Sequence, residues 1–281
     1  MRTINVKEIK KAVSDLCIKA NTDLRPDVFS AIKKAAGLET DKRAKKIWGV
    51  LIENAAIAKR DRLAICQDTG IACVYLEIGR DVKLTGASLE RAVNDGVKLG
   101  YRRGYFRASI VDPLTRKNTG NNAPAVIKTK IVNGDKVRLT VIPKGFGCEN
   151  KNQIKMFKPT AGLKDVKKFI IDAVRQAGPD ACPPYVVGVG IGGTFEKAAE
   201  LSKEALLKTV SGVRCKVLSP ECRLEKELLK EINKLKIGPA GIGGKTTALA
   251  VNICSHPTHI AGLPVAVSIG CHAMRSATAV I

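Results

Sequence analysis

The sequence predicts an α+β fold, in which a mainly helical N-terminal part is followed by a mixed α/β region with glycine-rich loops. Apolar residues recur at helical spacing through residues 1–62, as in NVKEIKKAVSDLCIKAN. From about residue 107 the pattern changes to short apolar runs bounded by Gly, Pro, Asn and Asp, which is typical of strands and loops. Aromatic residues make up only 4% of the chain, so the core must be built from Ala, Val, Ile and Leu. We therefore expect one domain over residues 1–281, with a helical subregion 1–105 and a mixed α/β subregion 106–281.

Helices are expected wherever the helical spacing persists. Pro26 near the start and Gly37 past the end mark the second helix, because proline favours the first turn and glycine the position after the last. A buried strand, GIACVYLEIG, interrupts the helical segments after a break at LAICQDTG. The expected helices are 5–21, 25–37, 39–60, 88–104, 158–178, 195–208 and 221–235.

The part of the chain after residue 106 is expected to begin with an elaborate loop, RASIVDPLTRKNTGNNAPA. In the segment that follows, AVIKTKIVNGDKVRLTVIPKG, two alternating runs flank Asn133, Gly134 and Asp135, which is the pattern of a β-hairpin. Two further strands are expected in PPYVVGVGIGGT, which runs into a glycine loop, and in THIAGLPVAVSIGC. The sequence shows no internal repeat.

The charge of the chain is strongly positive, with 48 Lys and Arg against 26 Asp and Glu and a formal net charge of +22. Such a surplus attracts anions, which leaves nucleic acid, small acidic substrates and an acidic partner chain as alternatives. A nucleic-acid surface would gather its cations in a stripe with aromatic side chains. Here the cations are spread along helical segments such as DVKKFIIDAV, which favours solvated helix faces.

The cysteines give the first indication of a site. The segment MRTINVKEIKK lacks the apolar core of a signal peptide, and no apolar run approaches the roughly 18 residues of a membrane helix. We therefore expect a soluble, cytoplasmic protein whose nine cysteines are reduced thiols. Three of them, Cys66, Cys182 and Cys271, lie between an apolar run and a tight turn. Thiolates there suit an iron–sulfur cluster, although cysteine is more often a packing residue and no CxxC pair is present.

Two glycine-rich segments resemble nucleotide-binding motifs, but each lacks a required part. GVGIGG satisfies G-x-G-x-x-G, yet residues 210–216 hold no Asp or Glu to bind a ribose, which counts against NAD. Its backbone N–H groups could still bind an anion at a helix N-terminus. A phosphate-binding P-loop needs a glycine five positions before the glycine that precedes Lys-Ser/Thr, but in GPAGIGGKTTAL the residue five positions before Gly244 is Pro239. The segment therefore misses the P-loop pattern by one position, and we expect a glycine turn at the start of a helix.

Three polar residues are candidates for acid–base work or substrate binding. Asp68 directly follows Cys66 and Gln67, and it could move a proton or simply close an Asx turn. His259 lies in a polar loop before a strand, where a structural role is the alternative. Arg107 opens the RASIVDP loop and could clamp a carboxylate, or it could be one surface charge among many.

The motifs taken together resemble a known family. Their order along the chain is similar to that in the class I (iron–sulfur) fumarate hydratases, and more closely to the alpha subunit where that enzyme is split into two chains. The L(+)-tartrate dehydratase alpha subunit shares these motifs. The resemblance covers nearly the whole chain from about residue 40 and is carried by ICQDTG, RASIVDPL with KNTGNNAPA, KGFGCENKN, CPPYVVGVGIGGT, IGPAGIGGKTTALAV, and THIAGLPVAV with GCHAMR.

The resemblance implies a 4Fe–4S cluster, surrounded by the glycine-rich loops, with one iron left open to act as a Lewis acid on the substrate. By the motif match its ligands are Cys66, Cys182 and Cys271. Cys148 is left out, because the family often has Ser there. Asp68 and His259 then match catalytic positions that manage protons. The matching substrate-binding positions are Gln67, Arg107 and Gly147.

The resemblance also implies a partner. In single-chain members a second domain completes the site, so this chain is expected to be inactive without a beta subunit, in a heterotetramer of two alpha and two beta chains. The expected reaction is the reversible hydration of fumarate to (S)-malate, with L(+)-tartrate dehydration as the alternative. A basic nucleic-acid-binding protein and a nicotinamide-dependent enzyme are the alternatives from other classes; membrane and nucleic acid are not expected as partners.

Overall fold

The computed structural model describes residues 1–210 and 219–281, and it confirms the predicted α+β class. The chain divides into two compact units, each made of segments that are distant in the sequence. Unit 1 comprises Met1–Arg25, Asn54–Phe146 and Arg275–Ile281, and unit 2 comprises Pro26–Glu53 and Gly147–Met274. Each unit has its own sheet and its own hydrophobic core. Within the described residues, no helix is long and apolar enough to cross a membrane.

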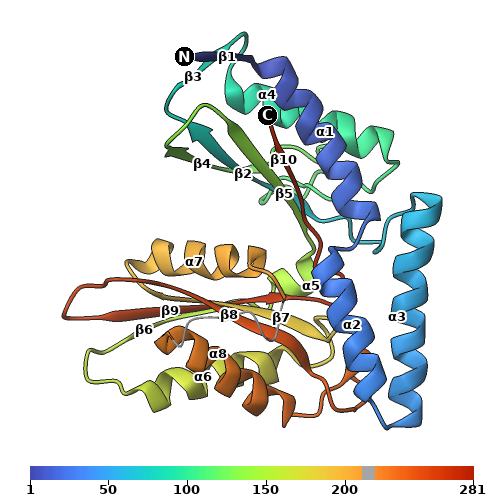
Figure 1. Cartoon of the computed structure of the whole chain (residues 1–281), viewed down its shortest axis with the longest axis vertical. Helices are drawn as coiled ribbons and strands as arrows, with labels where there is room; N and C mark the ends of the chain where they lie inside the picture. The colour runs from blue at the N-terminus through green and yellow to red at the C-terminus, as the bar shows by residue number, and fades with distance from the viewer. Residues whose placement is uncertain (211–218) are drawn as a thin grey trace. The chain divides into compact units, whose positions relative to one another are not determined.

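Unit 1 is built on a four-stranded sheet with the order β10-β5-β2-β4. The central strand β2 is parallel to β4 and antiparallel to β5, and β10 adds antiparallel to β5. Buried side chains alternate along β2, as at Val74 and Leu76, and form one core with α1 and α4 (Figure 1). The strands are β2 (Ile71–Gly79), β4 (Val126–Val132), β5 (Val137–Lys144) and β10 (Ala277–Val280).

The helices of unit 1 start at the residues that favour helix initiation. The side chain of Asn5 caps α1 together with Glu8 in a capping box, and Ser88 caps α4. The two helices cross closely, because a Cβ at Gly96 would lie 2.7 Å from the Lys10 carbonyl oxygen. The other elements are α1 (Val6–Thr22), α4 (Leu89–Arg103), part of α3 (Lys42–Asp61), and the parallel pair β1 (Arg2–Asn5) and β3 (Val82–Thr85).

The predicted hairpin after residue 125 is wrong. The turn at Gly134 is present, but β4 and β5 lie on opposite sides of β2 and do not pair. The connection between them crosses the end of β2, where the Gly79 N–H donates to the Lys136 carbonyl at 2.9 Å. A Cβ at Gly79 would lie 2.3 Å from the Gly134 oxygen, so this crossing needs glycine. A local turn signal therefore did not decide which strands pair.

Unit 2 has a sheet of order β6-β9-β7-β8, with α7 on one face and α6 and α8 on the other (Figure 1). The strands are β6 (Gln153–Phe157), β7 (Tyr185–Gly192), β8 (Ala248–His256) and β9 (Leu263–Gly270). The helices are α2 (Pro26–Leu38), the first part of α3, α5 (Phe146–Glu149, whose first residue belongs to unit 1), α6 (Leu163–Ala177), α7 (Phe195–Leu207), α8 (Pro220–Asn233) and the 3₁₀ turn η1 (Pro239–Gly241).

The two sheets share one arrangement. In each, a central strand (β2 or β7) has a parallel neighbour (β4 or β8) and an antiparallel neighbour (β5 or β9), which is followed by an outer antiparallel strand (β10 or β6). The outer strand of unit 1 follows β9 in the chain, and that of unit 2 follows β5. The central strand of each sheet begins at one end of that sheet, and we call this end the motif end. There β5 or β9 ends, and β10 or β6 begins.

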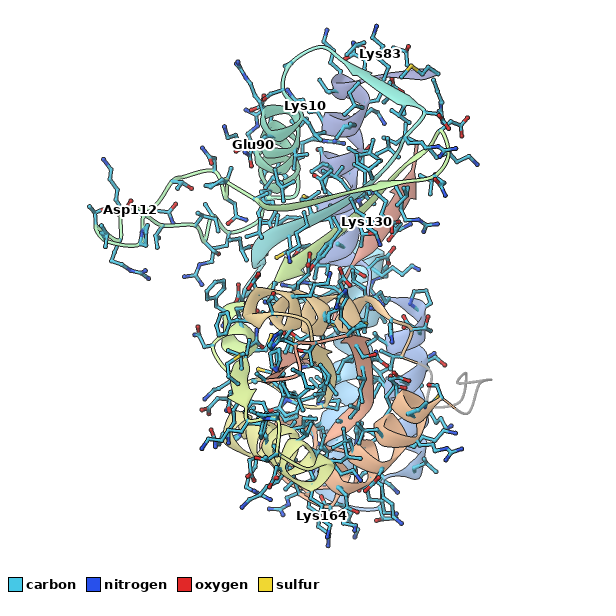
Figure 2. All side chains as sticks on the ribbon, turned by 90° about the vertical axis from the view of Figure 1, so that its left-hand side faces the viewer. Lys10, Lys83, Glu90, Asp112, Lys130 and Lys164 are labelled. Carbon is cyan, nitrogen blue, oxygen red and sulfur yellow. The ribbon has the colours of Figure 1, made fainter. Side chains whose placement is uncertain are left out.

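Of the other sequence predictions, some are confirmed and some are wrong. The predicted loop between α4 and β4 is confirmed, and Figure 2 shows Asp112 at its far end. The second helix ends at Leu38, one residue beyond Gly37. The GIGGKTT turn precedes the strand β8, not a helix. Among the described cysteines Cys222 is disulfide-bonded, so the expectation of reduced thiols throughout is wrong. Seven others form no disulfide, and Cys215 lies outside the described residues.

Candidate functional site

The loop ICQDTG reaches the motif end of unit 1 directly before β2. The Tyr101 hydroxyl of α4 donates to the carbonyls of Thr69 at 2.7 Å and Gly70 at 3.1 Å. The side chain of Asn122, which is fully buried, also donates to the Gly70 carbonyl at 3.0 Å. Gly70 has φ +72°, and a Cβ there would lie 2.7 Å from the backbone of Lys144. The loop is thus fixed by three separate elements of unit 1.

Asp68 is oriented by backbone donors on both of its carboxylate oxygens. Oδ1 accepts from the Gly70 N–H at 2.9 Å, and Oδ2 accepts from the Phe146 N–H at 2.7 Å. A Cβ at Gly145 would lie 3.0 Å from Oδ2. The predicted Asx turn is therefore present, and the carboxylate additionally joins the start of β2 to the end of β5. A half-buried carboxylate held in this way has one fixed orientation.

Gln67 precedes Asp68 in the chain, and the backbone of Arg107 contacts Thr69, the residue after it. The Arg107 carbonyl accepts from the Thr69 hydroxyl at 3.0 Å, which places the start of the RASIVDP loop next to ICQDTG. The Arg107 and Gln67 side chains are both exposed, whereas Cys66 is half-buried. Unit 1 therefore brings together four of the predicted site residues, and two of these can bind a polar ligand from solution.

Sequence reasoning missed one residue of this cluster, Arg275. Its side chain is 4% exposed and donates through Nη2 to the Asp68 carbonyl, while its Nε is buried without a hydrogen-bond partner. Burying a cation costs free energy, so a buried arginine usually has a structural or functional role. The only signal in the sequence is that Arg275 closes the GCHAMR motif.

The motif end of unit 2 carries the other two predicted ligands. Cys182 precedes β7 and has φ +55°, and Cys271 follows β9 directly. The Cys182 carbonyl accepts from the His272 N–H at 3.1 Å, and the His272 Nδ1 lies 3.2 Å from the same oxygen. The two cysteine loops are therefore tied together. Cys182 is exposed and Cys271 half-buried, so both thiols are accessible.

Tyr185 packs in one hydrophobic cluster with a third cysteine, Cys148, and Cys271 packs against that cluster. Burial, followed by the negative charges of Cys182, Asp180, Cys148 and Cys271 when ionised, raises the pKa of Tyr185. Its hydroxyl donates to the Gly178 carbonyl. Cys148 itself is buried, unlike the two predicted ligands. Gly147 is exposed, and a Cβ there would meet the Asp180 carbonyl only at 3.6 Å, so its backbone is open to solvent.

His259 lies elsewhere in unit 2. It belongs to the loop between β8 and β9, at the opposite end of the sheet from Cys182 and Cys271. Its side chain is exposed, and its Nδ1 accepts from the Ala261 N–H at 3.1 Å. The structure therefore does not bring His259 to the cysteines of its own unit.

The fit of these residues to an iron–sulfur cluster rests on their chemistry and on the pairing in unit 2. Cys66, Cys182 and Cys271 are accessible thiols in loops and form no disulfide, and thiolates are the ligands that such clusters prefer. Over residues 1–210 and 219–281, no three His, Cys, Asp or Glu side chains are grouped closely enough to hold a metal ion. The donor chemistry fits, and in unit 2 the loops that carry two of the three donors are hydrogen-bonded to each other.

The glycine motifs serve packing. A Cβ at Gly188 would lie 2.2 Å from the Ser202 oxygen, and one at Gly190 would lie 2.0 Å from the Ala198 oxygen, so β7 needs glycine where α7 crosses it. In the other motif, the buried carboxylate of Glu39 accepts from the Lys245 N–H at 2.9 Å. The loop that resembles a P-loop thus binds a carboxylate of its own chain.

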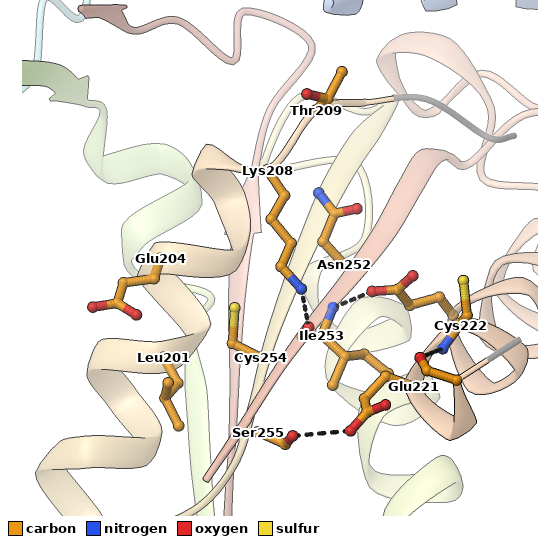
Figure 3. Close-up of a pocket in the computed structure, with 12 residues that line it drawn as sticks. Leu201, Glu204, Lys208, Thr209, Glu221, Cys222, Asn252, Ile253, Cys254 and Ser255 are labelled. Atoms are coloured by element: carbon orange, nitrogen blue, oxygen red, sulfur yellow. Dashed lines mark hydrogen bonds between the residues drawn. The ribbon is translucent and has the colours of Figure 1, made fainter. Parts of the chain in front are cut away.

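A cavity of about 630 Å³ lies between α7, α8 and β8, and none of the predicted site residues lines it (Figure 3). Its polar groups are engaged with the edge strand β8. Glu225 accepts from the Ile253 N–H at 2.7 Å, Lys208 donates to the Ile253 carbonyl, and Glu221 accepts from the Ser255 hydroxyl at 3.0 Å. These contacts close the open edge of the sheet, which otherwise could pair with another strand.

Comparison with known proteins matches this sequence to one class of enzyme, the hydro-lyases that add or remove water. Residues 10–280 match the family described as fumarate hydratase (Fumerase), so the chain belongs to the fumarate hydratase family and the resemblance seen in its motifs is confirmed. A Methanocaldococcus jannaschii protein provisionally named L(+)-tartrate dehydratase subunit alpha is 37% identical over 96% of both chains. The protein named L(+)-tartrate dehydratase subunit alpha in Escherichia coli K12 is 31% identical over 98% of this chain and 91% of its own.

Proposed function

We propose that this chain is the alpha subunit of an iron–sulfur hydro-lyase that hydrates fumarate reversibly to (S)-malate. One observation carries the proposal. In both units, family motifs that could bear chemistry lie at the motif end of the sheet, where hydrogen bonds tie them together: Asp68 to Phe146 in unit 1, and Cys182 to His272 in unit 2. Loops at strand ends, placed by a rigid sheet, are where enzymes commonly carry their reacting groups.

Cys66, Cys182 and Cys271 would hold a 4Fe–4S cluster through their thiolates, with both units acting as one catalytic domain. When bound, the cluster supplies an open iron that acts as a Lewis acid toward the substrate carboxylate and hydroxyl. Cys148 is the matched comparison, because it belongs to the same hydrophobic cluster as Tyr185 but is buried.

The chain's own residues would bind and orient the dicarboxylate. The exposed Arg107 guanidinium suits bidentate binding of one carboxylate, and Gln67 and the open backbone of Gly147 offer further donors. Hydration across a double bond builds negative charge beside a carboxylate, and fixed donors stabilise that charge without reorganisation. Asp68, whose orientation is fixed by two N–H donors, would move the proton at carbon or at the attacking water.

The relatives are named alpha subunits, and we propose that a beta subunit completes the site here as well. The assembly would contain two alpha and two beta chains and work in the cytoplasm. The net charge of +22 suits a more acidic beta chain and would draw a dicarboxylate toward the site.

L(+)-tartrate is the second candidate substrate. The relatives with the identities quoted above carry the tartrate dehydratase name, which favours it. Both reactions remove or add water on a four-carbon dicarboxylate, so the alpha-chain residues would have the same roles in either.

The test is anaerobic co-expression with the beta subunit, followed by iron and sulfide analysis and by assays with fumarate and with L(+)-tartrate. We expect about four irons and four sulfides per alpha chain, lost in Cys66→Ser, Cys182→Ser and Cys271→Ser but kept in Cys148→Ser. The better substrate identifies the enzyme. A wild-type complex without iron, or one with a full cluster that acts on neither acid, would refute the proposal.

A further inference from the structure

The loop 238–245, which contains the segment that resembles a P-loop, is folded back on itself. A Cβ at Gly238 would lie 1.7 Å from the Gly243 carbonyl oxygen, so only glycine fits where the two ends of the loop meet. The Gly243 N–H donates to the Ile237 carbonyl at 2.9 Å, which closes the loop at its base. The loop is therefore a compact element that can support a neighbouring segment.

One side of this loop contacts the turn that carries Cys182. The Ala240 N–H donates to the Pro183 carbonyl at 2.9 Å, and a Cβ at Gly241 would lie 2.2 Å from the Pro179 Cβ. The turn itself is closed by the Cys182 N–H, which donates to the Pro179 carbonyl at 3.0 Å. The loop thus contacts the turn both before and after the cysteine.

The backbone of Cys182 needs such support, because its φ is +55°. A residue other than glycine in this left-handed region costs about 1–3 kcal/mol and persists only where its surroundings impose the conformation. The Cys182 carbonyl also accepts from the His272 N–H at 3.1 Å. The conformation of Cys182 therefore affects both its own thiol and the loop that follows Cys271.

The other side of the loop is held by Glu39, whose side chain is 3% exposed. Its Oε2 accepts from the Lys245 N–H at 2.9 Å, and a Cβ at Gly244 would lie 2.7 Å from the same oxygen. Its Oε1 accepts from the N–H groups of Thr40 at 2.8 Å and Asp41 at 3.1 Å, which fixes the direction of the carboxylate. Burying a carboxylate costs free energy, and hydrogen bonds from two separate segments offset that cost.

We propose that Glu39 is a positioning residue for Cys182. Its carboxylate fixes the loop 238–245, and this loop holds the Cys182 backbone in the left-handed conformation that places the thiol. The inference rests on the proposed function, because that function is what gives the thiol a cluster to bind. The alternative is a purely local role, in which Glu39 only joins the start of α3 to the end of the loop.

The first test is native-state hydrogen exchange on the full chain, purified without iron. Glu39→Met removes both acceptor oxygens and keeps most of the bulk of the side chain. If Glu39 supports Cys182 through the loop, the Ala240 and Cys182 amides should exchange roughly 10- to 100-fold faster than in the wild type. Faster exchange confined to Asp41 and Lys245 would show a purely local role and overturn the proposal.

Gly241→Ala approaches the same coupling from the opposite side. Its Cβ would collide with Pro179, so the loop must move away from the Cys182 turn while the Glu39 carboxylate is still present. Exchange at the Cys182 amide should again be faster, whereas the Lys245 amide should keep its protection. An unchanged Cys182 amide would show that the loop does not hold the turn, and this variant decides the question even if Glu39→Met does not fold.

Asp41→Ala is the matched control. The Asp41 carboxylate accepts from the N–H groups of Arg43 and Ala44, both at 2.9 Å, so the change weakens the start of α3. It keeps the backbone N–H that donates to Glu39 and does not alter the loop 238–245. Exchange at Cys182 should therefore match the wild type. Equal acceleration in Asp41→Ala and Glu39→Met would indicate general loosening of unit 2 and overturn the proposal.

The second test asks whether the thiol itself is displaced. In the complex with the beta subunit, reconstituted anaerobically, loss of iron to a ferrous chelator should be roughly 10- to 100-fold faster in Glu39→Met than in the wild type or Asp41→Ala. Equal rates would overturn the inference, because the thiol would then keep its position. If the wild-type complex holds no iron, the proposed function fails, and the exchange experiments alone decide whether Glu39 positions the Cys182 backbone.

Discussion

Replacing Arg275 with methionine removes the side-chain donor from the Asp68 carbonyl while keeping most of the apolar bulk. A hydrogen bond from a charged donor contributes about 1.5–3 kcal/mol. Removing a buried cation also relieves its desolvation, so the global free energy of unfolding should change by less than about 1 kcal/mol. The loss should therefore appear locally, as easier opening of the ICQDTG loop.

Two amides report on that opening, because Gly70 and Phe146 donate to the Asp68 carboxylate. A loss of about 1.5–3 kcal/mol in local stability corresponds to hydrogen exchange roughly 10- to 150-fold faster at these amides. Native-state exchange followed by mass spectrometry or NMR measures it. Arg103→Met is the matched control, since Arg103 donates to Asp15 at 2.9 Å on the helical side of unit 1.

The reasoning fails if exchange at Gly70 and Phe146 is unchanged in Arg275→Met, or if Arg103→Met speeds it equally. It also fails if Arg275→Met lowers the free energy of unfolding by several kcal/mol, because Arg275 would then support the core of unit 1 and not the loop.

Three further changes test the packing and charge arguments. Gly190→Ala should cost about 1–3 kcal/mol or more in urea unfolding, because its Cβ would lie 2.0 Å from a carbonyl of α7; a loss below 0.5 kcal/mol would contradict the close approach. For Glu39, burial opposes ionisation, but N–H donors including Lys245 outweigh it and hold its pKa below the usual value. The stabilisation by the Glu39 carboxylate is thus complete above about pH 4.3 and is lost as the pH falls through the lower pKa of the folded state. In Glu39→Gln the urea midpoint should therefore decrease less steeply as the pH falls through that range. An unchanged pH profile would contradict this argument. Glu225→Ala should cost about 1–3 kcal/mol, because the buried Ile253 N–H loses its acceptor, and a neutral result would show that water replaces it.

The helices could be predicted from the sequence because their signals are local. Capping residues such as Asn5 and Ser88, and apolar spacing within a single segment, determine where a helix starts and which face it buries. The same holds for the glycine loop after β7 and for the loop between α4 and β4. Each of these features depends on residues that are close in the chain.

The order of the strands could not be predicted, because it depends on partners far apart in the chain. Gly134 gives a genuine turn signal, but β2 takes the position between β4 and β5, and the turn only crosses its end. Similarly, β8 follows a glycine turn that a helix could equally follow. Strand pairing depends on which other segments cover the two edges of a strand, and the sequence of a single segment does not contain that information.

The candidate site was predicted residue by residue from the family motifs, and the structure adds what the motifs omit. Asp68 accepts a hydrogen bond from the Phe146 N–H, and the Cys182 carbonyl accepts one from His272, the residue after Cys271. Arg275 has no sequence signal beyond its motif, because the partner that explains it is a backbone carbonyl more than two hundred positions away. His259 shows the converse, since closeness in sequence to Cys271 does not mean closeness in space.

The exchange of outer strands between the two units has a kinetic consequence. β10 pairs with β5, joining Ala277 to Val141, so the sheet of unit 1 stays one strand short until residues 277–280 have been synthesised. During translation β5 therefore has an open edge while Gly147–Met274 of unit 2 emerge from the ribosome, and an open edge invites pairing with other chains. Folding should consequently be slow and late, as expected for a protein whose closing contact spans such a long loop.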